Sequence, residues 1–382
     1  MRFRRLTTLL AVPVIAACAA PSVAPTEAGA TQAGLMETFA AMSAQLTAAA
    51  VPSSQPDSPS ATPELLTVAS PIPSEPAPAS GDGPIIGNCP VYPPDNYWNT
   101  RVDSLPVDPN SAAYIAALDP GAGIHPDFGS GEWNGGPIGI PFMLIPASTP
   151  KVPISFYYPD DSDPGPYPIP ANPLIEGGPD SDGDRHILLV DQDNCLLYEV
   201  YDAYPAANGA WEAGSGAIFD LRSNALRPDE WTSADAAGFA IFPGLVRYDE
   251  VASGEINHAI RFTAEAIRHS YIWPARHRAT CGDRGDDDLS VPPMGQRFRL
   301  KASFDVSGYP HDVQVILVAM QTYGVVLADC GSNWFISGSP DSRWLDEELV
   351  DSLRGVHGSD FEAVDTSGLM LDPDSGQARE SP

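Results

Sequence analysis

Between residues 185 and 306 the chain is a succession of short segments with alternating polar and apolar residues, separated by turns rich in Gly, Asp and Pro. These segments are 185–191, 195–203, 216–223, 245–251, 257–264, 271–277 and 297–306. Closely spaced short strands with no crossover helix between them are typical of a sandwich or barrel, not of a parallel α/β sheet. The sequence therefore predicts a mainly β domain with an antiparallel β-sandwich or jelly-roll-like fold.

Two or three helices are expected at the margins of this β domain. Residues 108–121 predict a short helix, with Pro109 near its first turn and Gly121 after its end. Residues 309–324 predict the longest helix, because their apolar residues recur at helical spacing. Residues 341–358 predict a further helix that stops at Gly355. Between these two helices, residues 325–330 and 334–338 are expected to form a β-hairpin.

The central strands carry the residues that are the strongest candidates for chemistry. Residues two apart on a strand point to the same face, and carboxylates on neighbouring strands can reach separations of ~5 to ~10 Å. If the strand faces line one concave sheet, Glu199 and Asp220 form a carboxylate pair, with His186 and His258 assisting proton transfer. One carboxyl acting as an acid and another as a base or nucleophile is the inventory of a glycoside hydrolase.

Aromatic and basic residues on the same strands predict a surface for substrate. Aromatic rings can support sugar rings, and an Arg, His and Tyr set could instead serve β-elimination on a uronic-acid polymer, as in a polysaccharide lyase. The candidate substrate-binding residues are Trp273, Trp211, Tyr201, Arg222 and His277. An alternative interpretation gives the strand acids only structural ion pairs, in which Glu199 and Asp220 pair with Arg222 and Arg261.

An acidic loop before the first central strand suggests a metal site. Asp180, Asp182 and Asp184 sit at alternate positions, as the first oxygen ligands of a calcium loop do. The sixth position is Arg185, where an EF-hand needs Gly, so any Ca²⁺ site here would be looser than an EF-hand. Ca²⁺ is the one cofactor that the sequence suggests.

Other catalytic motifs do not fit. Gly214-Ser215-Gly216 is shorter than the G-x-S-x-G of a nucleophile elbow and precedes a strand where the elbow requires a helix. The glycine-rich stretches match no phosphate-binding loop.

The N-terminus predicts export. Three Arg residues within residues 2–5 precede a short apolar segment, which is too short to span a bilayer. The segment ends in Ile-Ala-Ala-Cys at residues 15–18, which resembles the lipobox of bacterial lipoproteins. The resemblance implies a signal peptide at 1–17, lipidation of Cys18, and a domain held outside the cytoplasm by a lipid anchor that does not span the membrane.

Composition divides the remaining chain. Residues 18–87 are rich in Pro, Ala and Ser and are expected to form a disordered tether. A single globular domain is expected over 88–367, followed by a disordered tail at 368–382. The domain contains Cys89, Cys195, Cys281 and Cys330, and four cysteines in an exported chain favour two disulfides, with three possible pairings.

The net charge limits the partners. The chain carries 50 Asp and Glu against 20 Lys and Arg, a formal net charge of −30. This balance argues against nucleic acid and against direct adsorption to anionic lipid, both of which need clustered basic residues. An extracellular glycan or the cell envelope is the expected partner, with the membrane reached only through the lipid anchor.

The globular domain contains several distinctive motifs, which are Asn96-Tyr97-Trp98-Asn99-Thr100, Gly183-Asp184-Arg185-His186, Ser215-Gly216-Ala217 and the stretches 232–238 and 292–295. With these motifs the domain resembles a group of exported bacterial proteins of unknown function. The resemblance covers most of residues 89–365 and implies no activity. Two hypotheses follow from the sequence: an enzyme acting on extracellular polysaccharide, or a non-catalytic glycan-binding or structural lipoprotein domain.

Overall fold

A computed structural model describes residues 83–282 and 284–380, and the account below is confined to them. They belong to one unit of the chain, Pro76–Pro382. Their secondary structure is mainly strands with a few helices, which confirms the predicted fold class. Cys18 and the predicted signal peptide lie outside the described residues, as does nearly all of the predicted tether.

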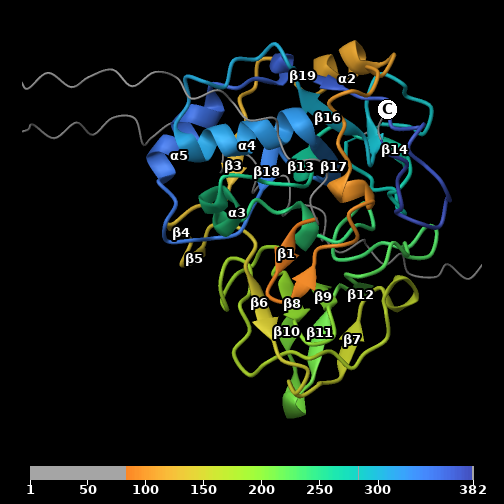
Figure 1. Cartoon of the computed structure of the whole chain (residues 1–382). Coiled ribbons are helices and arrows are strands. Elements are labelled where there is room, and N and C mark those ends of the chain that lie inside the picture. Colours follow the sequence, from red (N-terminus) through yellow and green to blue (C-terminus); the bar gives the residue numbers. More distant parts are fainter. Residues whose placement is uncertain (1–82, 283, 381–382) are drawn as a thin grey trace, which may run out of the picture. The chain divides into compact units, whose positions relative to one another are not determined.

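A four-stranded sheet forms the middle layer of the domain (Figure 1). Its strands are β12 (Ser215–Asp220), β9 (Leu196–Tyr201), β8 (Ile187–Asp191) and β6 (Phe142–Ile145), in that order. Every residue of β8 is buried, because both faces of the sheet are covered. Leu188 and Val190 join the larger core, whereas Ile187 and Leu189 join a smaller second core. The alternation of β8 thus assigns its two faces to two different cores.

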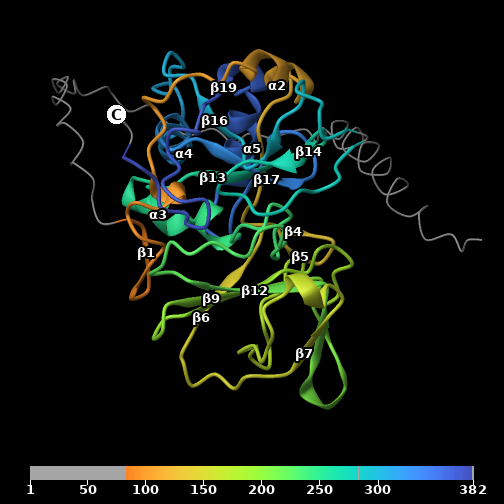
Figure 2. The same ribbon diagram turned by 90° about the vertical axis from the view of Figure 1, so that its right-hand side faces the viewer.

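The second core lies between this sheet and a three-stranded sheet, β10–β11–β7. Figures 1 and 2 show these strands in the lower part of the domain. Trp211 is buried at the start of β11 and contributes to this core, together with Tyr167 and Tyr198. The strands are β10 (Tyr204–Pro205), β11 (Trp211–Ala213) and β7 (Ile154–Phe156).

A six-stranded mixed sheet forms the upper part of the domain (Figures 1 and 2). Its order is β19 (Phe361–Ala363), β16 (Arg297–Leu300), β17 (Val325–Cys330), β13 (Ile260–Ala264), β18 (Phe335–Ser337) and β3 (His125–Asp127). β13–β17 and β18–β3 are parallel pairs, so the sheet is not purely antiparallel.

Helices pack around the six-stranded sheet. α4 (His311–Thr322) buries Val313, Ile316 and Leu317 in the larger core, and α5 (Asp346–Arg354) buries Leu349 and Leu353. The remaining helices are α2 (Ser111–Ala117) and α3 (Tyr248–Ser253). The remaining two-stranded pairs are β1 (Ile85–Ile86) with β2 (Cys89–Pro90), β4 (Glu132–Trp133) with β5 (Gly136–Pro137), and β14 (Arg268–Tyr271) with β15 (Pro293–Met294).

Three of the strand predictions are wrong. Residues 271–277 are expected as a strand, but only Tyr271 belongs to one, at the end of β14. Pro274 lacks the backbone N–H that a strand ladder needs. Residues 245–251, expected as a strand, lead into α3, which has Asp249 and Glu250 in its first turn and ends at Gly254 in the left-handed conformation. Acids at a helix N-terminus and a left-handed Gly at its end both favour a helix. The predicted hairpin of 325–330 and 334–338 does not form either, because β13 lies between β17 and β18.

The C-terminal segment from 368 is expected to be disordered, but residues 374–378 contact the rest of the domain. The Ser375 carbonyl accepts a hydrogen bond from the Trp273 indole at 2.8 Å, and Asp374 forms an ion pair with Arg276 at 2.9 Å. Bridge pairings join Asn96 to Gln377 and Ala225 to Ser375. These partners come from distant parts of the sequence, so local composition could not predict them.

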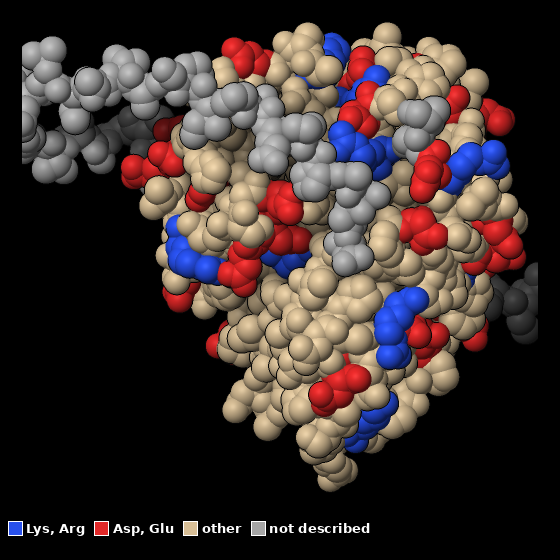
Figure 3. Space-filling model, in the orientation of Figure 1, with Lys and Arg blue, Asp and Glu red and all other residues tan. Residues whose placement is uncertain are grey.

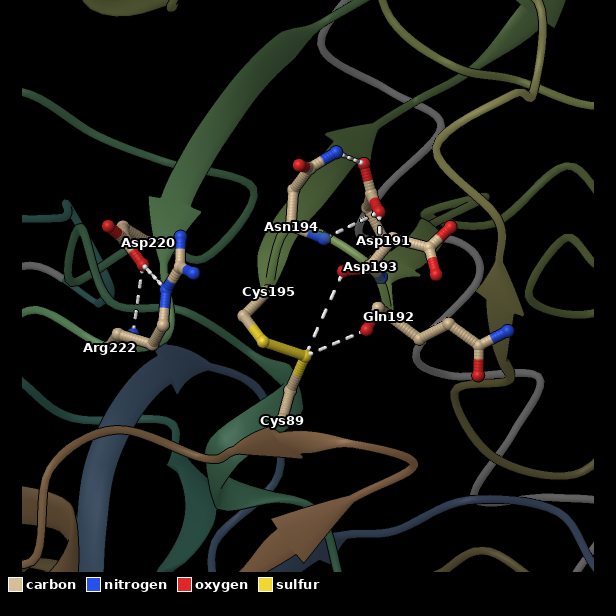
Figure 4. Close-up of a disulfide and its surroundings, with 8 residues drawn as sticks. All are labelled: Cys89, Asp191, Gln192, Asp193, Asn194, Cys195, Asp220 and Arg222. Carbon is tan, nitrogen blue, oxygen red and sulfur yellow. Dashed lines mark hydrogen bonds and ion pairs between the residues drawn. A yellow bond between two sulfur atoms is a disulfide. The ribbon is translucent and has the colours of Figure 1, made fainter.

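The four cysteines form two disulfides, as predicted, and the structure selects one of the three pairings. Cys89 pairs with Cys195, and Cys281 pairs with Cys330. Figure 4 shows Cys89, next to the start of the described chain, bonded to Cys195, the residue before β9. This bond ties the first segment of the domain to the strand that carries Glu199.

The visible surface in Figure 3 is mostly formed by uncharged residues, with acidic side chains scattered over it and fewer basic ones between them. Within residues 83–380, no helix has both the length and the apolar character to cross a membrane.

Candidate functional site

Six carboxylates from both large sheets and their loops gather around one histidine and one arginine. We call this group the acid cluster. Its members interact electrostatically with one another, although they come from distant parts of the sequence. A cluster of titratable groups with shifted pKa values is a frequent mark of a functional site. The acid cluster consists of Asp127, Glu176, Asp184, Glu199, Asp235 and Asp329, with His186 and Arg261.

His186 precedes β8 and lies buried in the middle of the acid cluster. Its Nδ1 lies 2.5 Å from Glu176 Oε2, and its Nε2 lies 3.0 Å from the Ala234 carbonyl oxygen. Both partners are acceptors, so the doubly protonated imidazolium satisfies both contacts. Burial is the largest single influence and acts to lower the pKa of His186, but the Glu176 carboxylate, its hydrogen bond and the nearby Asp184 together raise the pKa to about 9.

Glu176 shows the opposite shift. Burial acts to raise the pKa of its carboxyl, but the His186 imidazolium and its hydrogen bond hold the pKa below the usual value. The side chain is 25% exposed, so one edge of this ion pair reaches solvent. Glu176 is therefore an ionised carboxylate that is held in place by His186 and is partly accessible to solvent.

Arg261, on β13, connects the buried acids. Its Nη2 donates to Asp235 Oδ1 at 2.9 Å and to Asp329 Oδ2 at 2.6 Å, and its Nη1 donates to Ser337 Oγ at 2.6 Å. Burial raises the pKa of Asp235 and of Asp329, although Arg261 opposes this shift in both cases. Asp235 Oδ2 is buried and has no hydrogen-bond partner among the described residues. Arg261 thus holds Asp235 and Asp329 together, but its single positive charge does not fully offset the cost of burying both carboxylates.

Glu199 is fully buried, on the face of β9 that turns toward the larger core. Its Oε2 and Oε1 accept hydrogen bonds from the backbone N–H groups of Ile241 and Phe242 at 2.9 and 2.8 Å. These donors open the 3₁₀ turn Phe242–Gly244, so the carboxylate caps that turn. Burial raises the pKa of Glu199 to about 7 in spite of both donors. Glu199 positions a loop and does not reach solvent.

Asp184 and Asp127 form the exposed side of the acid cluster. Partial desolvation raises the pKa of Asp184, and the neighbouring Glu176 carboxylate adds to this effect. Desolvation together with Glu176 also raises the pKa of Asp127, at the end of β3, to about 6. The cluster therefore extends from the fully buried Glu199 and Asp235 to carboxyl groups in contact with solvent, where a substrate could reach them.

Glu176, Asp184 and His186 place one potential metal-ligand atom each within 4.8 Å of one another. Both nitrogens of His186 already have oxygen partners, so the two carboxylates are the groups with ligand capacity to spare. They offer at most four oxygens, and Ca²⁺ takes 6–8. Among residues 83–380 this is the one such group, and of the predicted calcium ligands it contains Asp184 but neither Asp180 nor Asp182.

The structure does not bring Glu199 and Asp220 together. In the β9–β12 pairing Glu199 lies opposite Ala217, whereas Asp220 lies opposite Leu196. Directly paired residues share a face and alternate residues change face, so the two carboxylates point to opposite sides of the sheet. Asp220 is the last residue of β12, and its Oδ1 accepts hydrogen bonds from the backbone N–H and the Nε of Arg222 (Figure 4). The predicted pairing of Glu199 with Asp220 is therefore wrong. Asp220 instead forms an exposed ion pair with Arg222.

His258 lies in a different group. Its Nε2 contacts Arg247 Nη2 at 3.1 Å and Glu250 Oε2 at 3.2 Å, and its Nδ1 contacts the Ala259 carbonyl at 2.8 Å. The ring is fully buried, and none of these partners belongs to the acid cluster. The structure gives His258 the role of a satisfied core residue that joins α3 to the start of β13.

The aromatic candidates separate in the same way. Tyr201 lies beside His186, with ring centroids 5.6 Å apart, so it borders the acid cluster. Trp211 is in the second core and cannot act as an exposed sugar platform. Trp273 is half-buried and lines a cavity elsewhere. His277 Nδ1 contacts the Ala236 carbonyl at 2.8 Å, next to the loop that carries Asp235.

The sequence prediction missed Asp127, Glu176, Asp235, Arg261 and Asp329 as site residues. Three of these, Asp127, Arg261 and Asp329, lie on strands of the six-stranded sheet, and the other two lie in loops. One signal was available, since a charged Arg261 within a buried strand needs an opposite charge. The sequence could not show which acids would meet it. Comparison with known proteins found no matching protein-family model, curated protein or solved structure.

Proposed function

We propose that this protein is a lipid-anchored, exported enzyme that hydrolyses an extracellular polysaccharide at the acid cluster. The observation that carries this proposal is the carboxylate pair Glu176–Asp184 beside His186. The two carboxyl groups have ligand atoms within 4.8 Å of each other, and their pKa values are shifted in opposite directions. Two nearby carboxyl groups with separated pKa values are what acid–base glycoside hydrolysis requires.

The roles follow from the protonation states. The Asp184 carboxyl, with its raised pKa, donates a proton to the glycosidic oxygen as the bond to the anomeric carbon breaks. The Glu176 carboxylate attacks that carbon, and water later releases the sugar while Asp184 takes back a proton. His186 holds Glu176 Oε2, which leaves Oε1 to face the substrate. The short separation matches the retaining class, in which the carboxyl groups are roughly 5–5.5 Å apart.

A second candidate reaction rests on Tyr201. Its ring lies beside His186, and the buried guanidinium of Arg261 is part of the same cluster. A Tyr, His and Arg set also suits β-elimination on a uronic-acid polymer. A lyase would leave an unsaturated uronate that absorbs ultraviolet light, whereas a hydrolase would not.

The test is a panel of neutral and uronic-acid polysaccharides, assayed for new reducing ends and for unsaturated-product absorbance. The full chain carrying Cys18→Ser is used, so that it stays in solution. New reducing ends without absorbance support the hydrolase. Absorbance moves the assignment to a lyase. Glycan binding without either product supports the non-catalytic module. If no polysaccharide is cleaved and none is bound, the result contradicts a role on polysaccharide.

A further inference from the structure

A cavity of about 490 Å³ lies away from the acid cluster, and no member of that cluster lines it. Its walls come from the segment before α2, from β14 and β15, and from residues 364–370 (Figure 1). The volume falls within the roughly 300–1,000 Å³ range of small-ligand sites. The lining combines an indole, a guanidinium, two carboxyl groups, and amide and hydroxyl groups. The residues used below are Trp273, Arg268, Asp108 and Asp365.

We infer that this cavity is a second glycan-binding site, which holds neutral sugar residues of a chain. Sugars present polar hydroxyl edges and apolar C–H faces, so they need hydrogen-bonding groups beside a flat aromatic ring. The inference shares with the proposed function the ligand class, a glycan, and requires no chemistry at the acid cluster.

Trp273 supplies the aromatic wall. Its Nε1 donates to the Ser375 carbonyl at 2.8 Å, and its ring packs edge-to-face on Tyr97 with centroids 5.3 Å apart. These contacts fix the orientation of the indole, which is only half-buried and lines the cavity. A ring that is already held in place loses little conformational freedom when a ligand stacks on it.

Arg268 supplies donors. Its Nε is buried without a hydrogen-bond partner among the described residues, although the side chain lines the cavity. Because Nε has almost no exposed surface, the donors for a sugar hydroxyl are the terminal nitrogens of the same guanidinium, which also interacts with Tyr114 on the cavity wall.

Asp108 and Asp365 supply acceptors and set the charge. Asp108 Oδ1 accepts from the Asn110 backbone N–H at 2.7 Å, and Asp365 Oδ1 accepts from the Ser367 backbone N–H at 2.9 Å. Each carboxylate is therefore oriented through one oxygen and keeps the other for a ligand hydroxyl. Two acids against one Arg disfavour an anionic uronate, so the lining selects neutral sugars.

The test measures binding by calorimetry, with cello-, chito-, xylo- and mannohexaose and an oligogalacturonate as probes. The full chain with Cys18→Ser and Glu176→Gln is used, which removes the proposed nucleophile. Trp273→Ala and Arg268→Met are each expected to weaken binding of a neutral hexasaccharide by roughly tenfold or more, the effect of losing about 1.4 kcal/mol. Trp133→Ala, at an exposed tryptophan of β4 outside the cavity, is the matched control and is expected to bind as before.

The inference would be overturned if Trp273→Ala and Arg268→Met both bind the neutral hexasaccharides as tightly as the parent protein does. Binding of the oligogalacturonate alone, or of none of the probes, would also overturn it. Because Trp273→Ala also loses contacts to Ser375 and Tyr97, its fold is checked by circular dichroism, and Arg268→Met stands as the second variant. Binding lost in both variants supports the cavity even if no polysaccharide is cleaved. Cleavage with unweakened binding refutes the cavity and leaves the proposed function standing.

Discussion

His186 has an oxygen partner for each ring nitrogen, and one of these partners is the carboxylate proposed as nucleophile. The imidazolium therefore fixes Glu176 and keeps it ionised. Glu199 has a different role, because both of its carboxylate oxygens accept hydrogen bonds from backbone N–H groups. At the scale of single residues, the Glu176 carboxylate is held by the His186 imidazolium and is partly exposed to solvent. The Glu199 carboxylate is buried and holds a loop in place.

The pKa of His186 tests this support directly. In the wild type it is expected near 9, and Glu176→Gln is expected to lower it, because the contribution that raises it most is removed. The raised pKa stabilises the fold fully below pH 6.5, and this stabilisation is lost as pH rises toward 9. The check is a titration of the imidazole resonances by NMR, and a wild-type pKa at or below 6.5 would contradict the assignment.

Glu199 makes the unfolding free energy depend on pH. Its folded pKa of about 7 exceeds the ordinary 4.5, so the folded state binds more protons between these values. Stability should fall as pH rises from 4.5 to 7, by at most roughly 3 kcal/mol from this group. Glu199→Gln is expected to flatten that slope in urea unfolding, whereas Asp220→Asn, on the opposite face, is the control. Identical slopes for all three proteins would refute the burial effect.

At the scale of elements, the acid cluster depends on how β8 and β9 meet β13 and β17. The four-stranded sheet contributes Glu199 and the residues before β8, and the six-stranded sheet contributes Arg261 and Asp329. Periodicity correctly indicated β8, β9, β12 and β13. It could not give the register between β9 and β12, and a one-residue difference moves a side chain to the other face. That is why Asp220 was wrongly paired with Glu199.

The Cys89–Cys195 disulfide anchors the start of β9 and closes a loop with a sequence separation of 106. Replacing both cysteines with Ala is expected to lower the unfolding free energy by about 4–5 kcal/mol, because the unfolded chain gains entropy. Cys281→Ala with Cys330→Ala opens a loop with a separation of 49 and should cost slightly less. Urea denaturation measures both, and an unchanged midpoint without the Cys89–Cys195 bond would contradict the expectation.

At the scale of the whole molecule, the fold class and the presence of two disulfides could be predicted from composition and strand spacing. The cluster could be predicted only in part. His186 and Asp184 could be identified as candidates because they lie directly before a predicted strand. Glu176, Asp235 and Asp329 lie near them only through tertiary contacts, which no local sequence pattern encodes. The same holds for the C-terminal segment, whose Asp374 pairs with Arg276.

The proposed lipid anchor at Cys18 leads to a further prediction. Acyl chains on Cys18 would carry the exported chain into the detergent phase of a Triton X-114 separation, because each buried CH₂ contributes about 0.8 kcal/mol. Cys18→Ser is expected to move the protein to the aqueous phase. Equal partitioning of both proteins would show that the residue is not lipidated.

The most direct test of the central claim compares four proteins on the polysaccharide that the panel identifies: the wild type, Glu176→Gln, Asp184→Asn and Asp220→Asn. Initial rates of reducing-end release are measured at the optimal pH. We predict that Glu176→Gln and Asp184→Asn each lose at least about 100-fold in rate, the lower range for acid–base catalysis, and that Asp220→Asn keeps the wild-type rate. Loss of activity in Asp220→Asn with near-normal rates in the other two variants would contradict the account.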